Sequence, residues 1–214
     1  MSRSYGSLSR RRFYQLVGSR RPVVGGSAGN EQLTAVVASI LLVLFAIEGA
    51  TLLNIGSLLG VHVFVGILLV PVVGLKLGSV AWRMVRYYLG HEDYVRQGPP
   101  HVAMRAIVAP LIVLSTALLL GTGIALLALG QTSPMLVGLH QASFIVWLGA
   151  TSVHVLGHVL KVPRLLRTRV PGLGLRLFAT AGAVVAGLAL AVATIPAADR
   201  LEDSASAHIG LSDS

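Results

Sequence analysis

The sequence contains no cysteine. This absence excludes disulfide bonds, thiolate metal sites, cysteine-ligated iron–sulfur clusters and the covalent attachment of a c-type haem. Charged residues are also scarce, at 12% of the 214 residues, whereas 54% are hydrophobic. A soluble domain of this length could not bury so much apolar surface, so the composition predicts a protein whose solvent is the lipid bilayer.

Five apolar stretches are long enough to cross a bilayer, because about 20 helical residues cover its hydrocarbon core. Backbone groups in lipid must be hydrogen-bonded within their own segment, which predicts helices. The predicted spans are residues 33–55, 57–81, 104–129, 135–160 and 174–195. The fold class is therefore predicted as all-α, an integral membrane bundle of five transmembrane helices, with four in an antiparallel core and the fifth flanking it.

Two short links make neighbouring spans antiparallel. The turn "NIGS", residues 54–57, separates the first two spans, and "GQTSP", residues 130–134, joins the third and fourth. In the second link Ser133 is predicted to be a helix N-cap and Pro134 to occupy the first helical position.

The orientation follows from the basic residues, which accumulate on the cytoplasmic side of a membrane protein. With five spans, every Lys and Arg except Lys76 and Arg200 belongs to the N-terminal arm 1–32, to one of the two long loops on the same side, or, for Arg105 and Arg176, to the start of the span that follows a loop. The sequence thus predicts a multi-pass protein of a bacterial cell membrane with a cytoplasmic N-terminus. Residues 196–214 are predicted to be a disordered acidic tail outside. The formal net charge of +9 is a topology signal in this interpretation, and nucleic-acid binding is not expected.

Ionisable side chains at membrane depth are costly and usually face a bundle interior. Here they are Glu48, His62, Lys76, His140, His154 and His158. At roughly 1.5 Å per residue, Glu48, His62 and His140 reach one level in the outer leaflet. His140 and His154 are 14 residues apart, so they share one helix face about 21 Å apart along the axis. His158 shares that face.

Histidines at matching depth on two facing helices suit the two axial ligands of a haem iron. The layout also resembles the group of membrane b-type cytochromes that includes cytochrome b, cytochrome b561 and formate dehydrogenase gamma subunits. The resemblance covers residues 57–160 and rests on His62, His140 and His154. The stretches "HVFVGILLVPVVGLKLGSVAWRMVRYY", "GPPHVAMR" and "LHQASFIVWLGATSVHVLGH" are similar to uncharacterised actinobacterial membrane proteins of cytochrome-b-like type.

The resemblance implies an outer haem b ligated by His62 and His140 and allows a second, inner haem. The inner partner of His154 should lie 14 residues after His62, but that position is Lys76. His101 is then the candidate ligand; otherwise the inner site has one histidine or does not exist. Further candidate partners of haem propionates, or second ligands, are His158, Lys76, Arg83 and Arg105. Glu48 is predicted to accept a hydrogen bond from a ligating histidine or to be a protonated structural carboxyl.

The predicted function is electron transfer through one or two bis-histidine haems, between a redox partner and the quinone pool. This makes the chain an electron-transfer subunit rather than a self-contained enzyme. One rival is a haem-free metal or proton transporter that uses Glu48, His62, His140 and His154. The other is a structural membrane protein without a cofactor, in which the histidines merely hydrogen-bond between helices.

Overall fold

The computed structural model of the chain describes residues 26–96, 98, 102, 104–167 and 170–212. All the elements that these residues form are helices, which confirms the all-α prediction. Their bounds are α2 (Gly26–Thr51), η1 (Leu52–Asn54), α3 (Ile55–Tyr88), α4 (Glu92–Arg96), η2 (Met104–Val108), α5 (Ala109–Leu129), α6 (Pro134–His158), η3 (Val159–Lys161), α7 (Val162–Arg167), α8 (Leu173–Ala193) and α9 (Ile195–Ser212).

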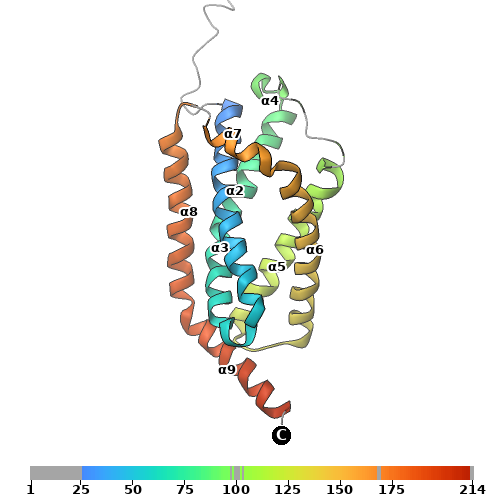
Figure 1. Cartoon of the computed structure of the whole chain (residues 1–214), viewed down its shortest axis with the longest axis vertical. Coiled ribbons are helices and arrows are strands. Elements are labelled where there is room, and N and C mark those ends of the chain that lie inside the picture. The colour runs from blue at the N-terminus through green and yellow to red at the C-terminus, as the bar shows by residue number, and fades with distance from the viewer. Residues whose placement is uncertain (1–25, 97, 99–101, 103, 168–169, 213–214) are drawn as a thin grey trace, which may run out of the picture.

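Four of these helical stretches are long and apolar enough to cross a membrane: Gly26–Tyr88, Ala106–Leu129, Pro134–His158 and Leu173–Ala193. The first is 63 residues long, because helical structure runs on from α2 through η1 into α3. The chain nevertheless reverses there, since Asn54 leaves helical geometry with φ −149° and ψ 63°. As a result α2 and α3 pack side by side (Figure 1).

The helices form two groups. In the first, α3 lies between α2 and α8, and its buried core is Val37, Leu41, Val65, Leu69, Val72 and Val73. Gly187 of α8 is in very close contact with the backbone carbonyl of Leu68, so only glycine fits at that crossing. In the second group, α5 and α6 form an antiparallel hairpin. α5 packs less extensively on α3 than on α6, so the two groups touch over a smaller area than the helices within each group.

The link between α5 and α6 agrees with the predicted turn. Gly130 ends α5 in the left-handed region at φ 62°, where glycine is the residue of choice. Ser133 is the N-cap residue of α6 and Pro134 opens the helix, although the serine hydroxyl makes no capping hydrogen bond.

The prediction of a disordered tail over residues 196–214 is wrong where the structure describes it, over residues 196–212. These residues belong to α9, which packs across α3 and α5 at the end of the bundle that carries η1. Ala198 and Leu201 are buried, and the backbone N–H of Thr132 donates to the hydroxyl of Ser204 at 3.3 Å. The polar composition concealed this small apolar face, which becomes buried only against the folded bundle.

The predicted N-terminal arm, residues 1–32, ends earlier than expected in the described part of the chain. Residues 26–32 already belong to α2, and residues 1–25 lie outside the described part of the chain. The second predicted span, 57–81, likewise continues as helix to Tyr88. We call the two ends of the bundle the η1 end, which α9 covers, and the α4 end, where α4 and α7 lie (Figure 1).

Candidate cofactor site

A cavity of about 710 Å³ separates the two groups of helices. Its walls come from α2 and α3 on one side and from α5 and α6 on the other, and Leu201 of α9 contributes at the η1 end. The lining is mostly apolar. Its ionisable side chains, among the residues that the structure describes, are Glu48, His62 and His140.

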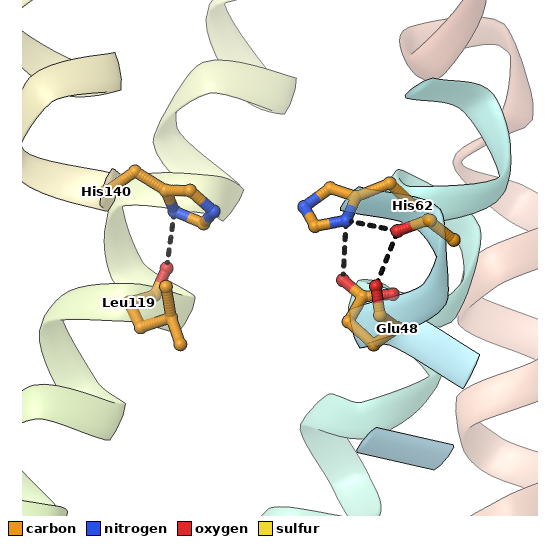
Figure 2. Close-up of polar contacts among 5 residues, drawn as sticks. Glu48, His62, Leu119 and His140 are labelled. Carbon is orange, nitrogen blue, oxygen red and sulfur yellow. Dashed lines mark hydrogen bonds and ion pairs between the residues drawn. The ribbon is translucent and has the colours of Figure 1, made fainter. Parts of the chain in front are cut away.

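The rings of His62 and His140 point toward each other across this cavity (Figure 2). Their centroids are 6.2 Å apart and their planes are nearly perpendicular, at 85°. The two rings therefore lie at one level, as the depth of each residue in its span predicted. Both side chains are only partly buried, because each ring projects into open space.

Protein acceptors fix the ring of His62 on the side away from the cavity. Its Nδ1 lies 3.1 Å from Oε1 of Glu48 and 2.9 Å from Oγ1 of Thr51 (Figure 2). The hydroxyl of Thr51 donates to the backbone carbonyl of Glu48 at 2.6 Å, so its oxygen is free to accept from the ring. These contacts favour the tautomer with the proton on Nδ1, which leaves a lone pair on Nε2.

His140 is held in the same way from the opposite wall. Its Nδ1 lies 3.1 Å from the backbone carbonyl of Leu119 (Figure 2) and 3.1 Å from Oγ1 of Thr122. A carbonyl can only accept, so Nδ1 carries the proton and Nε2 again keeps its lone pair. Within the described part of the chain, neither Nε2 has a protein hydrogen-bond partner. The site thus presents two opposed nitrogen ligands.

Two glycines make room for this arrangement. A Cβ added to Gly123 of α5 would lie 3.2 Å from Cε1 of His140, which is tighter than most real contacts. A Cβ added to Gly66 of α3 would lie 3.4 Å from Oε1 of Glu48. A side chain at Gly123 would crowd the ring of His140, so this glycine leaves room for the ring. At Gly66 an added Cβ would just come into contact with Glu48, the acceptor of His62.

Aromatic side chains line the cavity farther from the η1 end. Trp147 is buried, with the ring of Phe45 at 4.7 Å in an edge-on arrangement and that of Phe144 at 6.3 Å in a stacked one. This cluster packs α2 against α6, which is the ordinary role of large aromatics between helices. Thr151 also lines this part, and its hydroxyl is buried without a hydrogen-bond partner.

Among the described residues, the remaining predicted ligands are not brought to this cavity. The rings of His154 and His158 stack on each other at 4.6 Å, and Nδ1 of His158 lies 2.9 Å from the carbonyl of His154. Neither residue, nor Lys76 or Arg83, is among the cavity residues. Lys76 instead donates to the backbone carbonyl of Thr34 at 2.8 Å. His101 and the side chain of Arg105 lie outside the described part of the chain.

A bare metal site made of Glu48, His62, His140 and His154 is likewise not assembled. Among the described residues, no group of three or more His, Asp or Glu side chains is placed to hold a metal ion. His62, His140 and Glu48 line the same cavity, and Glu48 accepts from His62. His154 lies on another part of α6.

Sequence reasoning found the two facing histidines and Glu48 but missed three groups that orient the rings: Thr51, Thr122 and the carbonyl of Leu119. Thr122 lies inside "GTG", residues 121–123, whose glycines are typical of close contacts between helices and do not indicate a histidine partner. Thr51 precedes the "NIGS" turn by a few residues and gave no signal. A backbone carbonyl can never be identified from the sequence.

Fold and site together define a class: an all-helical protein with apolar helices suited to a lipid bilayer and a central cavity that two opposed histidines enter. No protein-family model, curated protein or solved structure matches this chain. The function therefore has to be argued from the site itself.

Proposed function

We propose that this chain is a membrane b-type cytochrome that holds one haem between His62 and His140. The observation that carries the proposal is the pair of opposed imidazoles, each with its Nδ1 bound to protein and its Nε2 facing a common cavity. Metal-ligating histidines usually donate their other ring N–H to a carboxylate or a backbone carbonyl, and both arrangements occur here.

The spacing of the rings fits a single iron between them. Histidine nitrogen binds transition metals at roughly 2 Å, and the ring centre lies roughly 1 Å behind that nitrogen. Two imidazoles on opposite sides of one metal therefore have centroids on the order of 6 Å apart. The observed separation is 6.2 Å. The cavity volume of about 710 Å³ lies within the roughly 300–1,000 Å³ typical of cofactor pockets.

A haem also explains why only two ligands are supplied. A bare zinc or similar ion needs three or four protein ligands, whereas the porphyrin provides four of its own. The mostly apolar lining would suit a macrocycle and would disfavour a hydrated ion. This contrast favours the haem over the rival transporter.

The proposal includes five membrane crossings, with α2 and α3 crossing separately. Each of these two helices exceeds the roughly 20 residues that one crossing needs. The concentration of Lys and Arg in the N-terminal arm and in two loops supports a cytoplasmic N-terminus and places the η1 end outside.

The proposed role is electron transfer between a redox partner and the quinone pool. Haem supplies the reversible one-electron chemistry when it is bound. The chain's own residues do the rest: His62 and His140 hold the iron, Glu48 and Thr51 fix one ring, and Leu119 and Thr122 fix the other. The apolar walls exclude water. We propose one haem because His154 is stacked on its own helix, away from the cavity.

A visible spectrum of the purified protein tests the proposal. Dithionite-reduced protein should show a sharp b-type alpha band, and a pyridine haemochrome assay should give one haem per chain. His62→Ala and His140→Ala should each abolish the band, while the matched variant His158→Ala should keep it. Circular dichroism and size-exclusion profiles establish that each variant is folded. Folded wild-type protein that stays colourless when haem is supplied would refute the proposal and favour a transporter or a structural protein.

A further inference from the structure

A second cavity, of about 920 Å³, lies at the α4 end, away from the histidine pair. It is lined by the first turns of α2, the last turns of α3, α4 and Arg176 of α8. The proposed haem site uses none of these residues. Along α3 the lining extends from Gly74 to Arg86, which is 12 residues or roughly 18 Å.

One wall of this groove is made of glycine. Gly26 and Gly29 come from α2, and Gly74 and Gly78 come from α3. A Cβ added to Gly74 or Gly78 would meet no other atom within 4 Å, so open space lies directly over the backbone there. Leu33 and Leu75 add apolar surface beside it. This part of the groove suits a slender hydrocarbon chain.

The other part of the groove carries a fixed positive charge. The guanidinium of Arg86 lies over the ring of Trp82 at 4.6 Å, and its Nη1 donates to Nε2 of His91 at 2.6 Å. Its Nε is buried with no hydrogen-bond partner. Within the described part of the chain, Arg86 forms no ion pair. Glu92 and Asp93 also line the groove, but the carboxylate of Glu92 is paired with Arg96 at 2.6 Å and Asp93 is exposed to solvent.

The corner between α3 and α4 builds this arrangement locally. Gly90, at φ 75°, reverses the chain after α3, and the N–H of His91 then donates to the carbonyl of Arg86 at 3.1 Å. Tyr94 is buried behind the corner. Trp, Tyr and Arg side chains at a helix end are typical of the headgroup level of a membrane.

We propose that this groove binds one anionic phospholipid, with its phosphate at Arg86 and an acyl chain along Gly78 and Gly74. The guanidinium of Arg86, which forms no ion pair with the described residues, is a charge-assisted donor suited to a phosphate oxygen. The roughly 18 Å of groove exceed half of a hydrocarbon core of about 30 Å, so a tail fits where a free phosphate would leave the glycine wall empty. The proposal does not depend on the haem.

The test uses full-length protein stripped of lipid in detergent. Phosphatidylglycerol, phosphatidylcholine or inorganic phosphate is then added, and native mass spectrometry and thermal unfolding measure retention and stabilisation. We expect phosphatidylglycerol to be retained and to raise Tm clearly more than phosphatidylcholine, with no effect of inorganic phosphate. Arg86→Gln should weaken retention at least about fivefold, as expected for the loss of one basic contact to an anionic lipid.

Gly78→Leu tests the acyl part without changing charge. The leucine has room to occupy the groove and favours the helix more than glycine does, so the protein should fold and yet lose the lipid. Arg200→Gln at the η1 end and Gly149→Leu on α6, where a Cβ also meets nothing within 4 Å, are matched controls that should bind as the wild type does. Equal retention of both lipids, stabilisation by inorganic phosphate alone, or unaltered binding by folded Gly78→Leu would overturn the proposal.

Discussion

The two ends of the bundle use histidine in opposite ways. At the η1 end, His62 and His140 come from different groups of helices and face each other at 6.2 Å across a cavity. Toward the α4 end, His154 and His158 belong to a single helix and stack on each other at 4.6 Å. The first two rings can bind one ligand between them, whereas the second two lie one turn apart on the same face of α6.

The acceptors sharpen the difference. Each ring at the η1 end is oriented by a group from another part of the chain, Glu48 for His62 and the Leu119 carbonyl for His140. His158 instead bonds to the backbone of its own helix, at the carbonyl of His154. Intramembrane histidines at a shared helical face are therefore not equivalent, because the neighbouring helices decide which of them meets a partner.

Among changes that leave both histidines in place, the largest effect that we expect comes from crowding the ring of His140. In Gly123→Val the new Cβ would start 3.2 Å from Cε1 of that ring, and the two methyl groups would force it away from the carbonyl of Leu119. Loss of such an orienting contact typically weakens metal binding 10- to 100-fold, so haem content should fall at least about tenfold. Pyridine haemochrome assays on folded protein measure it.

The control for this change is Gly121→Val, two residues earlier on α5, where a Cβ meets nothing within 4 Å. It carries the same helix cost of a β-branched residue and should retain full haem. If Gly123→Val also kept full haem, the contact of His140 with the carbonyl of Leu119 would not be needed for haem binding. The orienting contacts would then not distinguish the histidines at the η1 end from those at the α4 end.

The fold and the histidine pair could be predicted because they follow from local rules. Residues per turn and rise per residue place His62 and His140 at one level, and the structure brings them together. The same rules put His154 on the face of His140 but could not tell whether a partner faced it. That depends on how α3 packs, and there Lys76 is directed to the carbonyl of Thr34.

Two features of the fold were beyond such rules. The predicted tail, residues 196–214, has a composition typical of disorder, yet α9 forms because Ala198 and Leu201 are buried against the bundle. The fifth predicted span was expected to flank the core, and α8 does lie on its outer side (Figure 1), but its packing along α3 with Gly187 against Leu68 could not be predicted. Both outcomes are set by surfaces that exist only once the other helices have packed.

A smaller effect is expected when the acceptor of His62 changes from a carboxyl to an amide of the same shape. In Glu48→Gln an amide oxygen can still accept from Nδ1 of His62, so haem should stay bound. The amide is a weaker acceptor than a carboxylate and makes the ligand less basic, which favours reduced iron. Potentiometric titration should show a midpoint potential raised by on the order of tens of millivolts. The carboxylate control Glu202→Gln, on α9, should not change it, and an unchanged potential in Glu48→Gln would argue against the His62 contact.

The smallest effect should come from Lys76→Met, at the position where a second haem would need a histidine. The lysine makes one hydrogen bond, to the carbonyl of Thr34, so its loss should change the free energy of unfolding by roughly 1 kcal/mol. That corresponds to a shift in Tm of a few degrees. The haem stoichiometry should stay at one per chain, and the same should hold for His154→Ala. The opposite outcome is a wild-type protein with two haems per chain and a variant of either residue with only one. The α4 end would then also hold a haem, and the stacked rings of His154 and His158 would have to separate when it binds.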